Sequence, residues 1–315
     1  MKTSSKTIGV ILPCYNEEAV LLNSYAVLQK KMVDLKDKGL ITKESFLCFV
    51  DDGSKDLTWD IIEKFSNGNI VRGIKLSTNF GHQNALVAGL LTMKSEADCL
   101  ISIDVDLQDD IDVFDEMIRL YSEGNLIVSG VRDNRENDTF FKRVTAQLFY
   151  KLMIFMKVKT VYNHADFRLV DSRVLNELDR FNEVSLFLRG IFPLIGFKTT
   201  NVYYTRKNRV AGETKYPLRK MLSFAWNGIT SFSTAPLKLI FSLGILMFLI
   251  SIIIGCWVVV ASFNGHVIKG WASTLLLNLL FAGLNMVSLG VIGEYIGKIY
   301  QEVKQRPRFI IEKVL

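Results

Sequence analysis

The sequence predicts an α/β protein, a mostly parallel sheet domain followed by a two-helix membrane hairpin. Three observations predict it. Strand-like and helix-like segments alternate from residue 7 to residue 131, which is typical of a parallel sheet with helices on both faces. Polar clusters follow three of the strand-like segments. Two long runs without a charged residue, 239–263 and 271–293, lie near the C-terminus.

The expected strands are short apolar runs rich in β-branched residues, at 7–12, 46–50, 70–76, 99–103 and 126–131. After the first strand, apolar residues recur at helical spacings of four and three, at Leu21, Tyr25, Leu28, Met32 and Leu35. Further helices are expected at 57–65, 83–93 and 113–121.

The three polar clusters are residues 13–18, 51–54 and 104–110. Each follows an expected strand. In parallel α/β sheets, ligands bind beyond the carboxyl ends of the strands. The sequence therefore predicts that the three clusters share one binding site.

Two segments after residue 138 are both aromatic and basic. Residues 140–158 fit either a membrane interface or packing on the sheet. Residues 217–233 directly precede the first apolar run, so an interfacial amphipathic helix is the favoured interpretation there.

The two apolar runs are each long enough to span a bilayer, which takes about 20 residues. Two buried core helices are the alternative, but such helices rarely exceed about 14 fully apolar residues. The connecting loop, 264–270, is short and holds a single lysine, Lys269. Basic residues gather on the other side of the runs, at Arg206, Lys207, Arg209, Lys215, Arg219, Lys220 and Lys238 before them and at Lys298, Lys304, Arg306 and Arg308 after them. The positive-inside bias predicts a multi-pass membrane protein with both chain ends in the cytoplasm.

The formal net charge of +6 fits a surface beside anionic head groups and anionic lipid substrates. A nucleic-acid partner is not expected, because the sequence carries no recognition motif for one.

Asp104 and Asp106 stand two residues apart at the end of an expected strand, so they project to the same side. Two neighbouring carboxylates repel each other unless a cation lies between them. A divalent ion with oxygen ligands, to which Gln108 adds another oxygen, removes that repulsion and can bridge to a diphosphate. The alternative is a solvated acidic turn or a helix N-cap.

Residues 51–54, Asp-Asp-Gly-Ser, also end a strand. Ser54 fits a turn and N-cap for the following helix. A carboxylate in the same place can accept a hydrogen bond from a base N–H or a ribose hydroxyl.

These motifs, in this order and spacing, resemble the inverting GT-A glycosyltransferases of family 2: residues 10–18 (VILPCYNEE), 51–54 (DDGS) and 104–109 (DVDLQD). Further segments resemble the bactoprenol (undecaprenyl-phosphate) glucosyltransferases, relatives of dolichol-phosphate mannose synthase. They are residues 79–81, 166–169, 209–216 and 293–300. Asp110 and the pair His82 and Gln83 depart from the family pattern without removing a ligand it needs.

The resemblance implies a role for each matching residue. Pro13, Tyr15, Glu17 and Asp52 resemble the nucleoside-binding residues, with Asp52 at the base. Asp104, Asp106 and Gln108 resemble the site for Mg²⁺ or Mn²⁺ and the diphosphate, and Asp106 is also a candidate catalytic residue. Asp166 resembles the catalytic aspartate near the acceptor, which we interpret first as an orienting group and second as a general base. Arg206, Arg209, Thr214 and Lys215 resemble the acceptor-phosphate cluster, although generic positive-inside charge also explains the two arginines.

The implied organisation is a GT-A (Rossmann-like) catalytic domain over 1–212, an interfacial helix over 213–235, a transmembrane hairpin over 236–297 and a basic cytoplasmic tail over 298–315. The implied activity transfers a hexose, glucose first and N-acetylglucosamine second, from a UDP-sugar to polyprenyl phosphate at the cytoplasmic membrane. Self-association, a downstream flippase and a later acceptor glycosyltransferase for the cell envelope follow from the resemblance alone.

Two other enzyme classes are disfavoured. A processive polysaccharide synthase is expected to carry a Q-x-x-R-W motif, and a sugar nucleotidyltransferase a glycine-rich N-terminal signature; the sequence has neither. A membrane-tethered nucleotide-sugar sensor without turnover remains as the non-enzyme alternative.

Overall fold

The computed structural model describes residues 5–66, 70–132, 164–183, 188–205, 230, 233–263 and 270–315. The chain forms two compact units. The sheet unit comprises Met1–Tyr150, Lys159–Lys215 and Gln305–Leu315, and the helical unit comprises Lys151–Val158 and Tyr216–Lys304.

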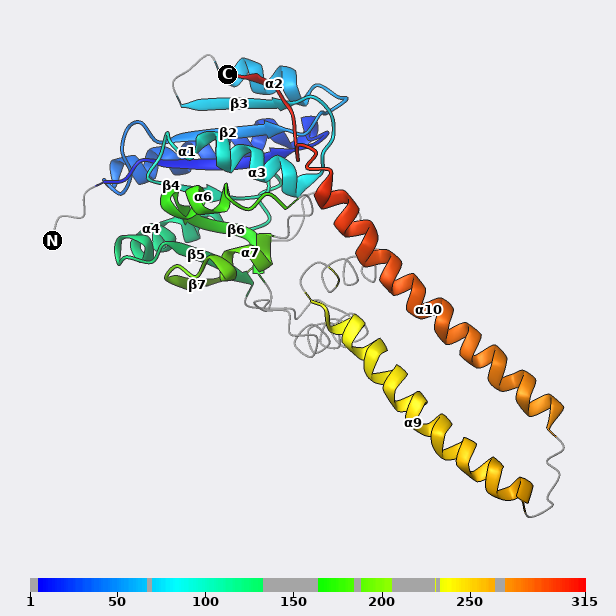
Figure 1. The fold of residues 1–315 in the computed structure, drawn as a ribbon. Coiled ribbons are helices and arrows are strands. Elements are labelled where there is room, and N and C mark those ends of the chain that lie inside the picture. Colours follow the sequence, from blue (N-terminus) through cyan, green and yellow to red (C-terminus); the bar gives the residue numbers. More distant parts are fainter. Residues whose placement is uncertain are drawn as a thin grey trace. The chain divides into compact units, whose positions relative to one another are not determined.

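The sheet unit is built on an eight-stranded sheet in the order β7-β5-β6-β4-β1-β2-β3-β8 (Figure 1). The first four strands are β1 (Ile8–Cys14), β2 (Phe46–Asp51), β3 (Val71–Leu76) and β4 (Cys99–Ser102), and they pair in parallel. β5 (Ile127–Arg132) and β7 (Thr199–Tyr204) are parallel to each other. Only β6 (His164–Asp171) and β8 (Ile311–Val314) run against their neighbours among the described strands. The predicted mostly parallel sheet is confirmed.

Helices connect the parallel strands, close to where the apolar spacing predicts them. They are α1 (Glu18–Asp37), α2 (Thr58–Phe65), α3 (His82–Met93) and α4 (Phe114–Ser122), the last preceded by a 3-10 turn, η1 (Ile111–Val113). β1 continues through Pro13 to Cys14, beyond the predicted strand end. The pairing of β1 with β4 ends at Ile11, so the N–H that Pro13 lacks has no strand partner to lose on that side.

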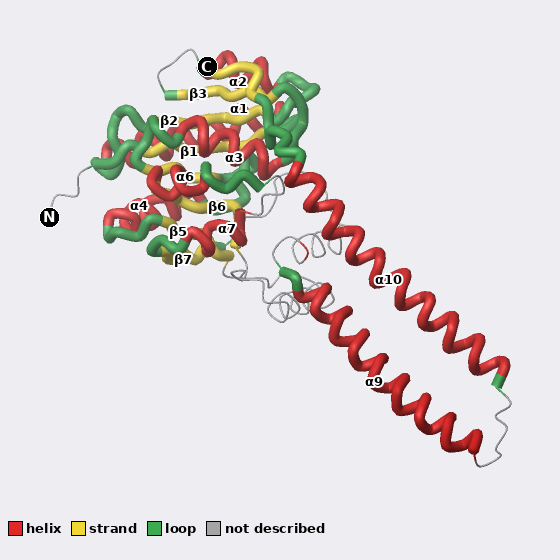
Figure 2. The backbone as a smooth tube through the Cα atoms, in the orientation of Figure 1, coloured by secondary structure: helices red, strands yellow, loops and turns green. Residues whose placement is uncertain are grey.

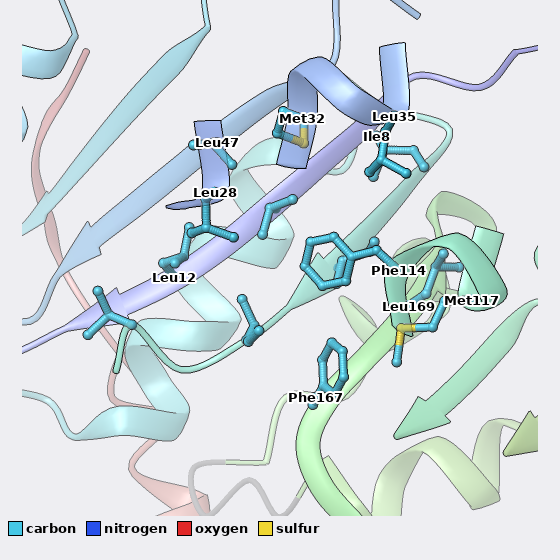
Figure 3. Close-up of a cluster of buried hydrophobic side chains, with 14 of the residues drawn as sticks. Ile8, Leu12, Leu28, Met32, Leu35, Leu47, Phe114, Met117, Phe167 and Leu169 are labelled. Carbon is cyan, nitrogen blue, oxygen red and sulfur yellow. The ribbon is translucent and has the colours of Figure 1, made fainter. Parts of the chain in front are cut away.

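The two faces of the sheet carry different helices. Alternate strand residues such as Val10 and Leu12 pack with side chains of α1, α2 and α4 in one hydrophobic cluster. Figure 3 shows this cluster, with Leu28 and Met32 of α1 over β1 and with Phe114 of α4 beside Phe167 of β6. α3 covers the opposite face, where a Cβ at Gly89 would meet Ile11 Cγ2 at 2.5 Å.

The segment from β6 to β7 contains elements that the sequence patterns did not predict. α6 (Ser172–Leu178) follows β6, and α7 (Leu188–Ile195) precedes β7. Asp171 caps α6 by accepting a hydrogen bond from Arg173 N. β6 enters the sheet between β4 and β5, so its first residues lie at the edge where β4 and β5 end.

The C-terminal residues also join the sheet. β8 pairs antiparallel with β3, and Gly73 and Leu315 exchange backbone hydrogen bonds beside it. The sequence predicted this segment only as a basic tail. The predicted domain boundaries themselves stay predictions.

In the helical unit, α9 (Ala235–Phe263) and α10 (Trp271–Val303) run in opposite directions (Figure 2). Ala235–Ile254 and Leu280–Val303 are long and apolar enough to cross a membrane by length and composition. Large apolar side chains on them are exposed, for example Phe241, Ile253 and Met286. Near the ends of the pair, the Tyr295 hydroxyl donates to the carbonyl oxygen of Ser233 at 2.6 Å. Most of the predicted interfacial helix, 213–235, and all of 140–158 lie outside the described residues.

Candidate active site

The polar clusters meet at one edge of the sheet, as the strand directions require. Asp52 follows β2, Asp104 lies two residues beyond β4, and Asp166 is near the start of the antiparallel β6. Ser102, the last residue of β4, donates from its hydroxyl to the Asp166 carbonyl oxygen at 2.5 Å. This contact fixes the Asp166 backbone beside the strand that leads to Asp104.

Hydrogen bonds tie together the loops after β1 and β2. Asn16 N donates to Ser54 Oγ at 2.9 Å, and the Asn16 side-chain oxygen accepts from Lys55 N at 2.8 Å. Asn16 has a φ of 54°, a left-handed conformation that asparagine tolerates better than most residues. The backbone N–H of Glu17 donates to Thr58 Oγ1 at 2.8 Å. The loop that carries the predicted nucleoside-binding residues is thus held on the adjoining strand–helix connection.

Among those predicted residues, Pro13 is buried within β1, whereas Tyr15 is 41% exposed. Tyr15 is therefore open to contact with a planar ligand. Both residues stay predictions as nucleotide contacts, as does Glu17.

Asp52 is buried and holds the turn that precedes α3. Its two carboxylate oxygens accept from the backbone N–H groups of Phe80 at 2.7 Å and Gly81 at 2.9 Å. Burial raises the pKa of Asp52, and the two backbone hydrogen bonds oppose that rise. Gly81 has a φ of 90°, which favours glycine because a Cβ is strained there. Contact of Asp52 with a nucleobase stays a prediction.

The Asp104-x-Asp106 segment is a tight turn with fixed ends. Leu107 N donates to the Asp104 carbonyl oxygen at 3.1 Å, and Leu107 adopts a φ of 47°. Ser24 of α1 donates from its hydroxyl to the Val105 carbonyl oxygen at 2.5 Å. A non-glycine residue held at positive φ stores strain that the surroundings must offset, and such residues cluster at functional sites.

The charges around Asp104 fit a divalent cation. Burial raises the pKa of Asp104, and the nearby carboxylates of Asp109, Asp166 and Asp106 raise it further, against an opposing effect of His82. A cation would relieve this repulsion. No group of three or more His, Cys, Asp or Glu side chains suited to a metal occurs in the described part of the chain. Mg²⁺ is commonly held by one or two carboxylates with the rest of its shell from water and substrate phosphates, so a pair such as Asp104 and Asp106 is compatible with it, and their role as ligands stays a prediction.

Gln108 contacts Asp106 directly. Its side-chain amide nitrogen donates to Asp106 Oδ2 at 2.5 Å. In this arrangement Gln108 orients the Asp106 carboxylate, and its role as a metal ligand stays a prediction.

Asp166 is held by two arginines: Arg189, which lies in no sequence motif, and Arg168, which lies in the motif 166–169 but was given no role there. Arg189 of α7 donates from Nε and from Nη2 to the two Asp166 oxygens, at 3.2 Å each. Arg168 Nη2 lies 4.0 Å from Asp166 Oδ1, and its guanidinium lies over the Phe192 ring at 4.6 Å. Burial alone would raise the pKa of Asp166, but Arg189 and Arg168 outweigh it and lower the pKa. Asp166 is therefore a fixed anion.

The alternation of β6 explains this grouping. Phe167 points into the cluster of Figure 3, so Asp166 and Arg168 point to the opposite face. Burial lowers the pKa of Arg168 to about 10, and Asp166 opposes that shift. α7 contributes Arg189 and Phe192 from positions three apart, which share one face of the helix.

His82 is a second unpredicted member of the site. Its Nε2 lies 3.4 Å from Asp104 Oδ1 and 4.0 Å from Asp166 Oδ2. In the sequence His82 is only a departure from the family pattern, because nothing local indicates that the start of α3 meets residues after β4 and in β6.

A third unpredicted group surrounds Asp109, which is buried. Tyr204 at the end of β7 donates from its hydroxyl to Asp109 Oδ1 at 2.7 Å, and Arg132 Nη2 lies 3.1 Å from the same oxygen. Burial would lower the pKa of Arg132, but Asp109 and Tyr204 raise it. These contacts hold Asp109, the residue after Gln108, in place. The predicted acceptor-phosphate residues, Arg206, Arg209, Thr214 and Lys215, lie outside the described residues.

The site thus has two neighbouring carboxylates, Asp104 and Asp106, at the same sheet edge as Asp166, a third carboxylate whose pKa two arginines lower. Carboxylates of this kind can bind a diphosphate through a metal ion and orient a polar reactant nearby.

The sequence matches the family described as "Glycosyl transferase family 2" over residues 9–191, more than half of the chain. The chain therefore belongs to glycosyltransferase family 2 and is a glycosyltransferase, as the motifs and the sheet order indicate. The resemblance and the GT-A fold class predicted from the sequence are confirmed.

Relatives share nearly the whole chain. "Uncharacterized glycosyltransferase YkoT" of Bacillus subtilis (strain 168) is 50% identical, with 99% of this chain and 93% of that protein covered. "Bactoprenol glucosyl transferase" of Shigella phage SfII is 37% identical, with 97% of each chain covered. Among solved structures, glucosyl-3-phosphoglycerate synthase from Mycobacterium tuberculosis aligns with a TM-score of 0.46 at 20% identity, over 72% of this chain and 79% of that one.

Proposed function

We propose that this glycosyltransferase moves a hexose, with glucose as the first choice, from a UDP-sugar to a polyprenyl phosphate at the cytoplasmic membrane face. The observation that carries the proposal is the full-length similarity to bactoprenol glucosyl transferases, at 37% identity for the phage SfII protein. The site is compatible with the proposal, because Asp104 and Asp106 lie near Asp166, a carboxylate whose pKa Arg189 and Arg168 lower.

The donor is expected at the loops after β1, β2 and β4. Tyr15 and Asp52 would contact the nucleoside, and Asp104 and Asp106 would hold a divalent cation on the diphosphate. When bound, that cation neutralises charge that develops on the departing nucleotide. Gln108 would keep Asp106 in the orientation that this requires.

The acceptor is expected to reach the site from the membrane. α9 and α10 would anchor the chain, and the flanking basic residues would keep both chain ends in the cytoplasm. Arg206 and Arg209 would bind the lipid phosphate bidentately, with Thr214 and Lys215 beside them.

A polyprenyl phosphate is largely dianionic near neutral pH, because its second pKa is roughly 6. It therefore needs little help to lose a proton before it attacks the anomeric carbon. Asp166, whose pKa Arg189 and Arg168 lower against the effect of burial, suits the role of an orienting anion better than that of a base. In-line attack inverts the anomeric centre, so an α-linked donor is expected to give a β-linked product.

The test is a donor panel. Membranes containing the protein receive undecaprenyl phosphate, Mg²⁺ or Mn²⁺, and radiolabelled UDP-glucose or UDP-N-acetylglucosamine. Label from UDP-glucose is expected in the organic phase, and a chelator is expected to abolish it. Label from the other sugar alone would change the assigned donor, and no lipid label with any donor would favour the non-catalytic sensor.

Asp106→Asn and Asp104→Asn test the cation site, with Asp60→Asn as the control. Asp60 is an exposed carboxylate on α2. Both site variants are expected to lose at least about 100-fold in rate, the scale of removing one strong electrostatic contact. Full activity of the double variant of Asp104 and Asp106 would overturn the assigned cation site.

A further inference from the structure

His82 lies in a segment with little freedom to move. Asp52 accepts hydrogen bonds from the N–H groups of Phe80 and Gly81, the two residues before it. Asn84 donates from its side-chain amide to the Phe80 carbonyl oxygen at 2.9 Å. The backbone at the start of α3 is therefore set by both the preceding turn and the helix itself.

α3 in turn is seated closely on the sheet. A Cβ at Gly89 would come within 2.5 Å of Ile11 Cγ2 and 2.7 Å of Val50 Cγ2, so no larger side chain fits between helix and strands. Packed interiors resist displacement of this kind. His82, the first residue of α3, therefore has a fixed backbone position at the edge where the strands end.

The imidazole contacts both functional carboxylates. Nε2 lies 3.4 Å from Asp104 on the donor side and 4.0 Å from Asp166 on the acceptor side. The His82 side chain is 45% exposed and that of Asp166 only 12%. With its hydrogen on Nε2, the imidazole offers a donor toward Asp104 Oδ1, whereas Asp166 Oδ2, at 4.0 Å, is too far for a direct hydrogen bond and interacts with the imidazole electrostatically. Two carboxylates that share a site repel each other, and the partly positive N–H edge of an imidazole between them offsets that repulsion.

We propose that His82 is a positioning residue, which holds Asp104 and Asp166 in the relative orientation that brings the two reactants together. The inference rests on the proposed function, because Asp104 serves the donor and Asp166 the acceptor only in that reaction. A misplacement of about 1 Å in a catalytic site can cost about 100-fold in rate. His82 therefore affects kcat more than the affinity for the nucleotide-sugar.

The test compares His82→Ala, His82→Gln and the neighbouring control Gln83→Ala in the lipid-transfer assay. His82→Ala is expected to lower kcat about 10- to 100-fold, with the KM for the UDP-sugar changed less than about threefold. His82→Gln keeps an N–H donor and is expected to recover part of kcat. Gln83→Ala is expected to match the wild type within about twofold, and all three variants to keep the wild-type Tm within about 3 °C.

A double-mutant cycle with Asp166→Asn measures the coupling. If His82 acts through Asp166, adding His82→Ala to Asp166→Asn lowers kcat by less than about threefold, because neighbours that act together are not additive. A fully additive loss would overturn the inference.

Two other results would also overturn it. In the first, the wild type is active and the kcat of His82→Ala matches it within about twofold. In the second, the kcat of His82→Gln is no higher than that of His82→Ala, and both variants have a lowered Tm. If the wild type itself transfers no sugar to lipid, the proposed function fails and this inference fails with it.

Discussion

Replacing Arg189 by alanine tests whether Asp166 depends on its arginine partner. The change removes two hydrogen bonds of 3.2 Å to a carboxylate whose side chain is 12% exposed. Hydrogen bonds to charged groups contribute about 1.5–3 kcal/mol each. Water can replace part of the lost hydrogen bonding to Asp166, because the Arg189 side chain is 33% exposed, and Arg168 remains nearby. We therefore expect a net loss of about 2–3 kcal/mol rather than the full sum.

The loss is expected in two measurements. The first is a Tm lowered by several degrees in detergent, at about 2–4 °C per kcal/mol for a chain of this size. The second is the rate of sugar transfer against pH. Because Arg189 holds the pKa of Asp166 below its ordinary value, its removal raises that pKa. The rate is then expected to fall at a higher pH than in the wild type as the solution is acidified.

Two variants serve as controls. Arg189→Lys keeps the charge but loses the planar two-point contact, so an intermediate loss is expected. Arg180→Ala removes an exposed arginine that pairs with Glu177 at 2.7 Å and is expected to cost less than about 0.5 kcal/mol. An Arg189→Ala variant with the wild-type Tm and the wild-type pH profile would refute the reasoning, as would an equal loss in Arg180→Ala.

Three further changes are informative. Even a Cβ at Gly89 would lie 2.5 Å from Ile11 Cγ2, so Gly89→Val is expected to lower the free energy of unfolding by at least about 1–3 kcal/mol, measured as a lowered Tm. An unchanged Tm would contradict the close packing of α3 on the sheet. Tyr204→Phe deletes the 2.7 Å hydrogen bond to buried Asp109 and is expected to cost about 1–3 kcal/mol by chemical denaturation; a loss under about 0.3 kcal/mol would argue against that bond. Burial would raise the pKa of Asp171, but the hydrogen bonds to its carboxylate lower that pKa below the unfolded value of about 3.9. The ionised carboxylate therefore stabilises the fold above that pH, and the stabilisation is lost as the pH falls through the pKa of the folded state. Asp171→Asn is therefore expected to lower the Tm at neutral pH, with a difference from the wild type that shrinks below about pH 4.

The parallel part of the fold was predictable because its signals are local. The spacing of Leu21, Leu28 and Leu35 predicts a helix, and β1, β2 and β4 are apolar runs that end in polar clusters. Since parallel strands end at one edge of a sheet, the position of Asp104 at the same edge as Asp52 follows from the order of elements alone.

β6, β8 and α7 were not predictable in the same way. β6 runs against its neighbours and enters between β4 and β5, and β8 reaches β3 from the far end of the chain. Neither placement leaves a periodic signal, because pairing partners distant in sequence are selected by the whole sheet. Arg189, on α7, has no motif that ties it to Asp166.

The sequence by itself determined the class of enzyme, the acidic residues at the strand ends and the two apolar helices, because these depend on residue type, order and spacing. The tertiary structure alone decided that His82 and Arg189 reach the carboxylates, since strand order and helix seating bring together side chains that no local pattern connects. It also decided that Asp166 is a fixed anion, because a carboxyl group takes its pKa from the charges packed around it.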